Sequence, residues 1–250
     1  AGVQADIKTI SACGCYAASA ITAITVQNTM GVTGVHPVPV EYIEKQIEAV
    51  LDDIGANAVK IGMLHSEEVV KCIARLLKKY NVKNVVLDPV MVSTSGHRLI
   101  EESAIQSLMD DLLPLATVIT PNIPEAEILL GKELNKQAQL YNAAKELGDK
   151  FGTSVLLKAG HLSEEKLVDI FYNKEDGMLY ELPSVRVHTR NTHGTGCTMS
   201  SAFASHLAKG CTMVEAARGA KEFINNAIVA GAEYEIGHGH GPVKHFFANW

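Results

Sequence analysis

The hydrophobic positions of this chain alternate between two patterns. Short apolar runs rich in β-branched residues, such as "NVVLDPVM", predict buried strands, and apolar residues at three- and four-residue spacing predict amphipathic helices. The expected strands are 20–28, 57–64, 84–91, 116–120 and 153–160, and 167–187 is expected to form a hairpin that turns at Asp176-Gly177. The expected helices are 39–55, 66–81, 101–114, 125–131, 136–150, 196–209 and 212–232.

Strands that alternate with helices in this way form a mostly parallel sheet covered on both faces. The expected fold class is therefore α/β, with three α/β/α layers around a mostly parallel central sheet. No internal repeat or linker interrupts the pattern, so residues 1–250 are expected to form one domain. Ligands of such sheets bind beyond the carboxyl ends of the strands. The residues expected to converge there on one cleft are Gln27, Asn28, Met63, Asp88, Thr120, Asn122 and Lys158.

Composition and charge exclude several classes of function. Hydrophobic residues make up 47% of the chain and charged residues 20%, an ordinary balance for a globular protein in water. The net charge is −6 and the lysines and arginines are scattered, so no basic face for nucleic acid is expected. No apolar run reaches the ~18–20 residues that a membrane helix needs. Five cysteines, an odd number, indicate reduced thiols and a cytoplasmic location rather than a disulfide framework.

Two acids and an amide stand at expected strand ends and helix starts. Asn122 and Glu125 have the spacing of a capping box, and capping is the commoner use of this pattern. Asp88 lies between "VVL" and "PV", where it has no capping role. Carboxylate and amide oxygens also suit Mg²⁺, which takes a few oxygen ligands and often keeps water. At this point both interpretations of Asn122 and Glu125 stay open.

The stretch "NTHGTGCT" (191–198) places a cysteine behind two spaced glycines at the start of an apolar helix. Glycines let the backbone approach a ligand, and a helix start offers free N–H groups and a positive dipole end to an anion. The same environment is expected to lower the pKa of Cys197. A cysteine hydrolase with His193 as base is the alternative, although no third, orienting residue is evident. A dinucleotide-binding fingerprint would need a third glycine.

Other cysteines and histidines are weaker candidates. No pairing of the remaining cysteines has the spacing of a zinc site, so core or incidental use is expected for them. The C-terminal "GHGHGPVKHFF" lacks an acid or cysteine that would complete a metal site, which favours a glycine-rich loop with exposed histidines. These residues are Cys13, Cys15, Cys72, Cys211, His238, His240 and His245.

Six short motifs in a fixed order carry a resemblance that no single one of them carries. They are "AGVQADIKT", "ITAITVQNT", "KIGML", "DPVMVSTSG", "TPNIPEAEIL" and "NTHGTGCTMSSA". In this order they resemble the hydroxymethylpyrimidine and hydroxymethylpyrimidine-phosphate kinases of thiamine biosynthesis, in the ribokinase-like superfamily, over essentially the whole chain. The family's glycine- and serine-rich first strand and turn are missing before "AGVQAD", so an incomplete N-terminus is expected.

The resemblance implies a ribokinase-like fold and an activity. ATP, bound with Mg²⁺, would phosphorylate the hydroxymethyl group of the pyrimidine and then the resulting monophosphate. Asp6 and Gln27 match positions that hydrogen-bond the aminopyrimidine, with Met63 and Val90 against its ring. Members of the family are typically homodimers, so a homodimer is expected here.

The resemblance also implies residues for the phosphates. Gly194, Thr195 and Gly196 match the anion hole, and Cys197 stands where sugar kinases of the superfamily carry an aspartate base. The ATP-binding residues implied are Asp88, Asn122, Lys158 and Thr192, and the metal-binding acids implied are Asp88 and Glu125.

Two rival functions remain at this stage. Pyridoxal kinases of the same superfamily phosphorylate the hydroxymethyl group of vitamin B6. Gln27 favours the aminopyrimidine, whose amine and ring nitrogens match the donor and acceptor of an amide, but activity on pyridoxal or pyridoxine is an open alternative. The second rival is a pyrimidine-binding protein without catalysis, against which the joint presence of Asp88, Glu125, Lys158 and Cys197 argues.

Overall fold

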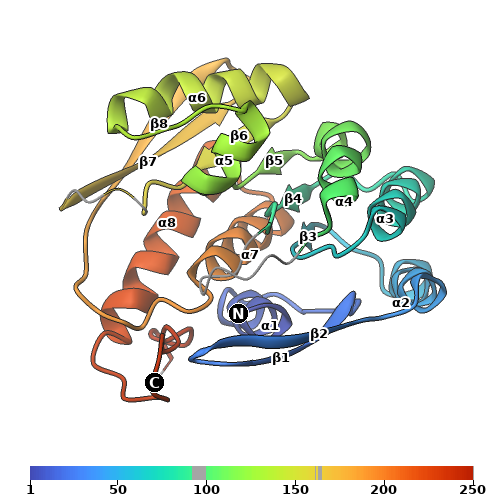
Figure 1. Ribbon diagram of the computed structural model, residues 1–250, viewed down its shortest axis with the longest axis horizontal. Helices are drawn as coiled ribbons and strands as arrows, with labels where there is room; N and C mark the ends of the chain where they lie inside the picture. Colours follow the sequence, from blue (N-terminus) through green and yellow to red (C-terminus); the bar gives the residue numbers. More distant parts are fainter. Residues whose placement is uncertain (92–99, 161, 163–164, 250) are drawn as a thin grey trace.

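The structure, a computed structural model, describes residues 1–91, 100–160, 162 and 165–249. Its centre is a six-stranded sheet in the order β3-β4-β5-β6-β7-β8 (Figure 1). Strands β3 to β6 are parallel to one another, β7 is antiparallel to β6, and β8 is antiparallel to β7. The mostly parallel sheet is therefore confirmed. Its strands are β3 (Val59–Ile61), β4 (Val85–Leu87), β5 (Val118–Ile119), β6 (Ser154–Leu157), β7 (Lys166–Asn173) and β8 (Met178–Val185).

Helices cover both faces of this sheet. One face carries α7 (Thr195–Ala208) and α8 (Met213–Ala230), which run side by side behind the strands (Figure 1). The first helix of the chain, α1 (Val3–Ala12), packs against α7. The helices of the other face are α2 (Val40–Asp53), α3 (Glu67–Lys79), α4 (Glu102–Ser107), α5 (Ile123–Leu130) and α6 (Gln137–Phe151). This arrangement confirms the three-layer α/β/α class.

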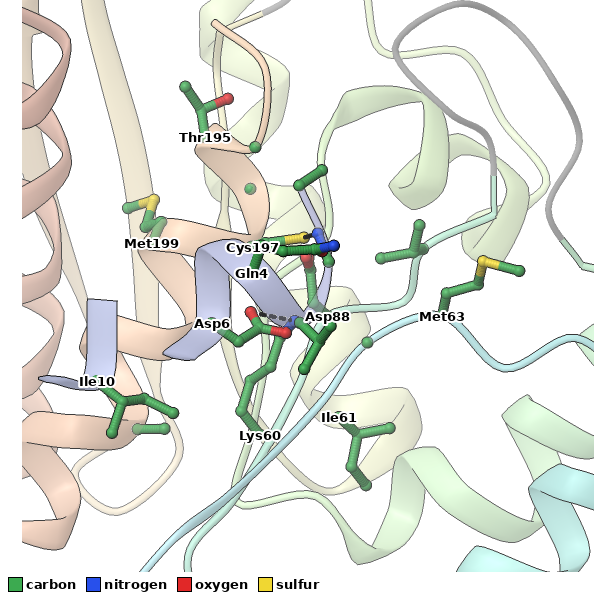
Figure 2. Close-up of a pocket in the computed structure, with 18 of the residues that line it drawn as sticks. Gln4, Asp6, Ile10, Lys60, Ile61, Met63, Asp88, Thr195, Cys197 and Met199 are labelled. Atoms are coloured by element: carbon green, nitrogen blue, oxygen red, sulfur yellow. Dashed lines mark hydrogen bonds and ion pairs between the residues drawn. The ribbon is translucent and has the colours of Figure 1, made fainter. Parts of the chain in front are cut away.

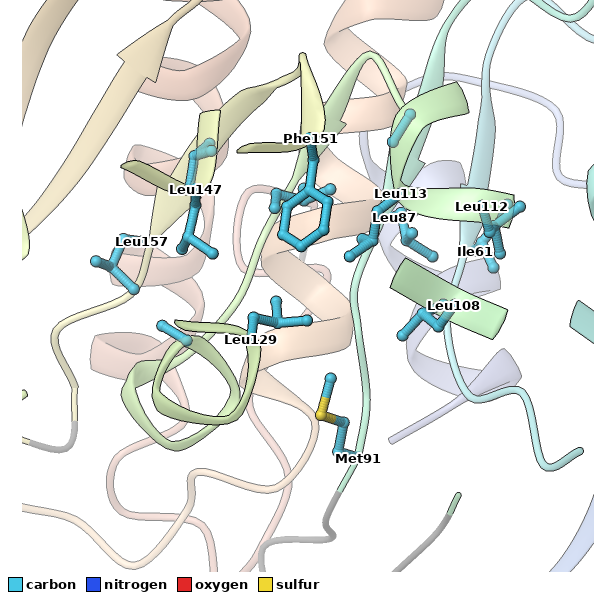
Figure 3. Packing of buried hydrophobic residues seen from close by; sticks show 14 of the residues in the cluster. Ile61, Leu87, Met91, Leu108, Leu112, Leu113, Leu129, Leu147, Phe151 and Leu157 are labelled. Carbon is cyan, nitrogen blue, oxygen red and sulfur yellow. The ribbon is translucent and has the colours of Figure 1, made fainter. Parts of the chain in front are cut away.

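The strand sequences explain the two covered faces. Successive side chains of a strand point to opposite sides, so a buried strand needs apolar residues at every position. Val86 of β4 belongs to the cluster under α7 and α8, whereas Leu87 belongs to the cluster under α3 to α6. Figure 3 shows the second cluster, in which Leu87, Leu147 and Leu157 lie together.

Helices α3, α5 and α8 begin where the sequence provides a capping side chain. The hydroxyl of Ser66 accepts a hydrogen bond from the backbone N–H of Val69 and starts α3. Acidic residues in the first turn of α3 and lysines in its last turn suit the helix dipole. The helix expected at 101–114 is α-helical only in its first part, α4. After Ser107 it continues as a π turn (Leu108–Leu112) and then as a 3₁₀ turn (Leu113–Leu115) that ends before β5.

The N-terminal region differs from the sequence-based expectation. Residues 3–12 form α1, which the hydrophobic pattern does not predict, and the strand expected at 20–28 lies outside the central sheet. This strand is β1 (Ala23–Asn28), and it pairs antiparallel with a second, unpredicted strand, β2 (Gly31–Pro37). Figure 1 shows the β1–β2 ribbon alongside α1, apart from the central sheet.

Two further observations bear on function. Among the described residues, no helix has the length and apolarity that crossing a membrane requires. The motif "DPVMVSTSG" is described only to Met91, and its remainder lies outside the described residues.

Candidate active site

One cleft, with a volume of about 1550 Å³, lies at the carboxyl ends of β3 to β6 (Figure 2). Each of these strands is followed within three residues by a residue of the cleft wall: Met63 after β3, Asp88 after β4, Asn122 after β5 and Lys158 after β6. The first turns of α1 and α7 complete the wall. Of the residues expected at the cleft, Thr120 does not line it, because it is fully buried beneath Asp88, to which its hydroxyl donates. The candidate site residues that do line the cleft are Asp6, Gln27, Met63, Asp88, Val90, Asn122, Glu125, Lys158, Thr192, Gly194, Thr195, Gly196 and Cys197.

A buried ion pair joins Lys158 to Asp88. Lys158 Nζ lies 2.8 Å from Asp88 Oδ1, and the hydroxyl of Thr120 donates to the same oxygen at 3.0 Å. Burial alone would raise the pKa of Asp88, but the ammonium groups of Lys158 and Lys60 hold that pKa below its ordinary value. The carboxylates of Asp88 and Glu125 likewise keep the pKa of Lys158 above its ordinary value despite burial. Both groups are therefore charged at neutral pH.

A second buried lysine, Lys60 of β3, also lines the cleft, and the sequence analysis does not identify it as a site residue. Its Nζ lies 2.9 Å from Asp6 Oδ1 on α1 (Figure 2). Ser201 of α7 donates to the same oxygen at 2.7 Å. The side chain of Lys60 is only 5% exposed. Burial lowers the pKa of Lys60, but Cys197, Asp6 and Asp88 together raise it above its ordinary value. The available signal was a single charge in an otherwise apolar strand, since such charges are rarely buried without a partner.

Asn122 and Glu125 do form a capping box at the start of α5. The Asn122 side chain accepts from the Glu125 N–H at 2.9 Å, and Glu125 Oε2 accepts from the Asn122 N–H at 2.8 Å. Burial raises the pKa of Glu125 to about 7 even though Lys158 opposes the shift. Glu125 thus caps a helix and also presents a buried acid to the cleft, so the two interpretations coexist in one residue.

The N-terminus of α7 closes the cleft opposite the lysines. Gly194 precedes the helix with φ of 85°, a left-handed conformation that favours glycine. The first N–H groups of a helix have no intrahelical partner. Here the N–H of Thr195 donates to Thr192 O at 3.3 Å, and among the described residues the N–H groups of Gly196 and Cys197 have no partner. A methyl group on Gly196 would lie 3.4 Å from Lys158 Nζ and 3.6 Å from Asp88 Oδ2. Free amides, the helix dipole and an ammonium group therefore converge on one point, which suits an anion.

The expectation that the pKa of Cys197 is lowered is wrong for the protein without ligands. Burial raises this pKa, and the carboxylates of Asp6 and Asp88 raise it further, against the opposing effect of Lys60. The Sγ atom accepts a long hydrogen bond from the N–H of Gly2 at 3.4 Å. The helix N-terminus alone does not decide the protonation state of this thiol, because it lies among carboxylates from distant parts of the chain.

The alternative pairing of Cys197 with His193 gains no support. No hydrogen bond joins these two side chains in the described part of the chain, and burial lowers the pKa of His193 to about 4. His193 instead donates its backbone N–H to Gly241 O at 3.0 Å. His245, expected to be exposed, is buried, and its Nε2 lies 3.1 Å from the Thr198 hydroxyl on α7.

Three of the residues matched to the pyrimidine, Gln27, Met63 and Val90, also line the cleft, whereas the fourth, Asp6, lies beside α7, where Ser201 donates to it. Gln27 Nε2 donates to the Thr25 hydroxyl at 2.7 Å, and in this orientation Gln27 Oε1 makes no hydrogen bond among the described residues. The Thr25 hydroxyl could equally donate to the oxygen of a flipped amide, so in either orientation one end of the amide stays available to a ligand. The backbone carbonyl of Met63 accepts from the Thr22 hydroxyl at 2.9 Å, and Met63 and Val90 both line the cleft.

Fold and site together define a class. The fold is a ribokinase-like α/β/α arrangement around one central sheet. At the carboxyl ends of its strands, the start of α7 lies next to the Lys158–Asp88 pair, an arrangement that suits a kinase of small molecules. The phosphomethylpyrimidine kinase family matches residues 1–244, and the chain belongs to this family.

Individual relatives agree with this assignment. The chain is 45% identical to the hydroxymethylpyrimidine/phosphomethylpyrimidine kinase of Rhizobium meliloti (strain 1021), over 100% of this chain and 93% of that protein. The crystal structure of phosphomethylpyrimidine kinase from Clostridium difficile 630 is 44% identical, with a TM-score of 0.80, over 91% of this chain and 93% of that one. The pyridoxal kinase from Staphylococcus aureus in complex with AMP-PCP and pyridoxal is 34% identical, with a TM-score of 0.89, over 100% of this chain and 89% of that one.

Proposed function

We propose that this protein transfers a phosphoryl group from ATP to 4-amino-5-hydroxymethyl-2-methylpyrimidine, and then a second one to the monophosphate, which yields the pyrophosphate used in thiamine biosynthesis. The observation that carries the proposal is the anion site of α7, which shares one cleft with Lys158, Asp88 and the polar groups of Gln27 and Asp6. The name and 45% identity of the Rhizobium meliloti relative support the choice of substrate.

The proposed phosphoryl transfer needs positioning and charge compensation more than covalent help. The hydroxymethyl oxygen would attack the γ-phosphorus in line with the leaving ADP oxygen. The N–H groups of Gly196 and Cys197 would hold oxygens of the moving group, and Lys158 would offset their negative charge. Thr192, Thr195, Gly194 and Asn122 would complete the contacts to the phosphates of ATP.

A magnesium ion fits the acids of the cleft. Glu125 is a buried acid whose pKa is raised to about 7, so a divalent cation beside it would favour its charged form. Asp88 Oδ1 is taken by Lys158 and Thr120, whereas Asp88 Oδ2 lies towards α7. These two carboxylates would hold the ion, which would supply positive charge to the triphosphate.

The aminopyrimidine would lie between Gln27 and Asp6. Gln27 Oε1 can accept from the exocyclic amine, because Gln27 Nε2 is held by Thr25. Asp6 Oδ1 is engaged by Lys60 and Ser201, which leaves Asp6 Oδ2 for the pyrimidine. Met63 and Val90 would contact the apolar faces of the ring.

Cys197 is proposed as the group that takes, or helps to take, the hydroxyl proton. In the free protein the carboxylate of Asp88 raises its pKa. A cation on Asp88 would remove that contribution, so the thiolate would form more readily in the loaded site. Little deprotonation is needed early in a loose transition state, so the expected contribution is modest.

A turnover assay with ATP tests the function directly. The substrates are the hydroxymethylpyrimidine, its monophosphate and pyridoxal, each at matched concentration, with ADP release as the readout. We expect turnover of both pyrimidines, and weaker turnover of pyridoxal, the ligand bound by the Staphylococcus aureus relative. Turnover of pyridoxal alone would replace the proposal by a pyridoxal kinase. Binding of pyrimidine without ADP release would identify a non-catalytic binding protein.

A cytoplasmic homodimer completes the proposal. In β1 the polar side chains are the more buried ones and the apolar side chains the more exposed ones, which is unusual for a strand at the surface. Thr25 and Gln27 are half-buried and line the cleft, whereas Ile24 and Val26 are 58% and 62% exposed. A second copy of the chain would cover this apolar face. Sedimentation equilibrium of the parent and of Ile24→Lys/Val26→Lys tests this, with a dimer expected for the parent and a monomer for the variant. The free thiols of all five cysteines agree with a reducing cytoplasm.

A further inference from the structure

A second buried ion pair lies behind the first, next to the backbone of Lys158. Asp169 of β7 and Lys221 of α8 are 4% and 8% exposed, and Lys221 Nζ lies 2.6 Å from Asp169 Oδ2. Neither residue belongs to a motif of the sequence analysis, and neither touches the Lys158–Asp88 pair directly in the described hydrogen bonds.

Asp169 is attached to the cleft through the backbone. The β6–β7 ladder ends at the pair Leu157↔Ile170. Beyond that point the N–H of Ala159 donates to Asp169 Oδ1 at 2.7 Å instead of to a strand carbonyl. The carbonyl of Ala159 accepts from the N–H of Leu162 at 3.0 Å. A side chain therefore takes over where the sheet stops, immediately after Lys158.

The peptide that carries Lys158 is thus held on both sides. On one side the N–H of Lys158 donates to Pro121 O at 2.9 Å, in the parallel bridge with Asn122. On the other side Asp169 holds the next N–H. A buried carboxylate without a cation is costly, and α8 supplies that cation as Lys221. Lys221 therefore stabilises the buried carboxylate of Asp169, and this carboxylate in turn accepts the hydrogen bond from Ala159.

We propose that Asp169, with Lys221 as its counter-charge, positions Lys158 for the phosphates of ATP. Asp169 fixes the peptide between Lys158 and Ala159, and this fixes the direction in which the Lys158 side chain enters the cleft. The alternative is that the pair only stabilises the packing of α8 against β7. The inference rests on the proposed role of Lys158 in ATP binding.

Two double variants separate positioning from stability. Asp169→Asn/Lys221→Met removes both charges but keeps an oxygen that accepts from Ala159. Asp169→Leu/Lys221→Met removes both charges and that acceptor. Charge and approximate side-chain size are thus the same in the two variants, whereas the oxygen that accepts from Ala159 is present in only one of them. The matched control is the exposed ion pair of α6, Lys145 and Asp149. Its two variants are Asp149→Asn/Lys145→Met and Asp149→Leu/Lys145→Met.

The readout is steady-state kinetics well below the melting temperature of both variants. We expect kcat/KM for ATP to be at least about tenfold lower in Asp169→Leu/Lys221→Met than in Asp169→Asn/Lys221→Met, because misplacement by ~1 Å can cost on the order of 10²-fold. KM for the pyrimidine should be the same in both, since Gln27 and Asp6 are untouched. The two control variants should not differ from each other.

Further variants keep the test decisive. Ala159→Pro removes the N–H donor while Asp169 and Lys221 stay paired, so it should show the same loss for ATP if the leucine variant does not fold. Equal kcat/KM for ATP in the two double variants, or parent values in Ala159→Pro, would overturn the positioning role. Lys158→Met tests separately whether Lys158 itself contributes to ATP binding. If turnover in Lys158→Met equals that of the parent, Lys158 has no such role, and the inference about Asp169 is wrong as well.

Discussion

Gly196 lies directly against Lys158: a methyl group on the glycine would stand 3.4 Å from the lysine Nζ. The first turn of α7 and the end of β6 are therefore in contact across the cleft. Because Lys158 is paired with Asp88 at 2.8 Å, the anion site is occupied on one side by a protein carboxylate when no phosphate is bound. A phosphate bound in the proposed anion site would therefore compete with Asp88 for the same ammonium group.

Asp88→Asn should uncouple nucleotide binding from turnover. The variant leaves Lys158 buried without its partner, so the free protein should lose about 3–5 kcal/mol of stability. ADP without metal can then provide the missing negative charge. We expect ADP in the presence of EDTA to raise the melting temperature more in Asp88→Asn than in the parent, while ATP turnover is lost. An equal or smaller thermal shift in the variant would contradict the competition between phosphate and Asp88.

Gln27→Ala should weaken binding of the pyrimidine and leave ATP affinity near that of the parent. Loss of one partner from a polar contact in a half-buried site costs about 1–3 kcal/mol. Thr25→Val is the companion variant, because it releases Gln27 Nε2 without removing the amide. We expect titration calorimetry to give a large loss in Gln27→Ala and a smaller one in Thr25→Val. Unchanged pyrimidine affinity in Gln27→Ala would show that Gln27 does not contact the ligand.

Glu125→Gln should reduce turnover far more than stability. Glutamine still offers an oxygen to the N–H of Asn122, so the start of α5 is preserved. It cannot supply the charge that helps to order a magnesium–triphosphate complex. The measurement is the magnesium concentration that gives half-maximal turnover, which should rise, together with a melting temperature that should not fall. A fall in melting temperature that parallels the loss of activity would restore a capping role alone.

The elements of the sheet were predictable because their signal is local. Most of the buried strands show an apolar run, as β4 and β5 do, and the covering helices an apolar stripe, and these patterns depend on only a few neighbouring residues. The end residues Asp88, Asn122 and Lys158 follow from the general position of ligands in such sheets. Their common cleft was therefore predictable from sequence alone.

The parts that were not predictable depend on distant contacts. Nothing in "GVTGVHP" distinguishes β2 from a loop, since it contains two glycines and a proline and exists only through its pairing with β1. Lys60 is a charged residue in an otherwise apolar strand, and its burial is explained only by the contact with Asp6, which also accepts from Ser201. Both residues are distant from Lys60 in the sequence. The pKa of Cys197 likewise depends on Asp6 and Asp88, which the local helix-start argument does not contain.

Alkylation of Cys197 by iodoacetamide should report its raised pKa in the protein without ligands. The thiolate is the reactive form, and below the pKa its fraction rises about tenfold per pH unit. Because burial places this pKa above the ordinary thiol value, the rate should still be rising between about pH 7 and pH 9. Lys60 lowers the pKa of Cys197, so Lys60→Met should slow the reaction at each pH. A plateau near neutral pH in the parent, measured by mass spectrometry of the peptide, would contradict this assignment.

Cys197→Ala tests whether the thiol takes part in proton transfer. Alanine keeps the N–H groups at the start of α7, so both ligand affinities and the melting temperature should stay near the parent values. General-base help is typically worth about 10²–10⁴ in rate, and the loose transition state of phosphoryl transfer places the expected loss of kcat near the lower limit. Cys197→Asp, which carries the base of the sugar kinases, should retain more turnover than alanine. If instead kcat in Cys197→Ala stays within a few-fold of the parent, the thiol only packs behind the anion site, and the proton leaves by way of the phosphate or water.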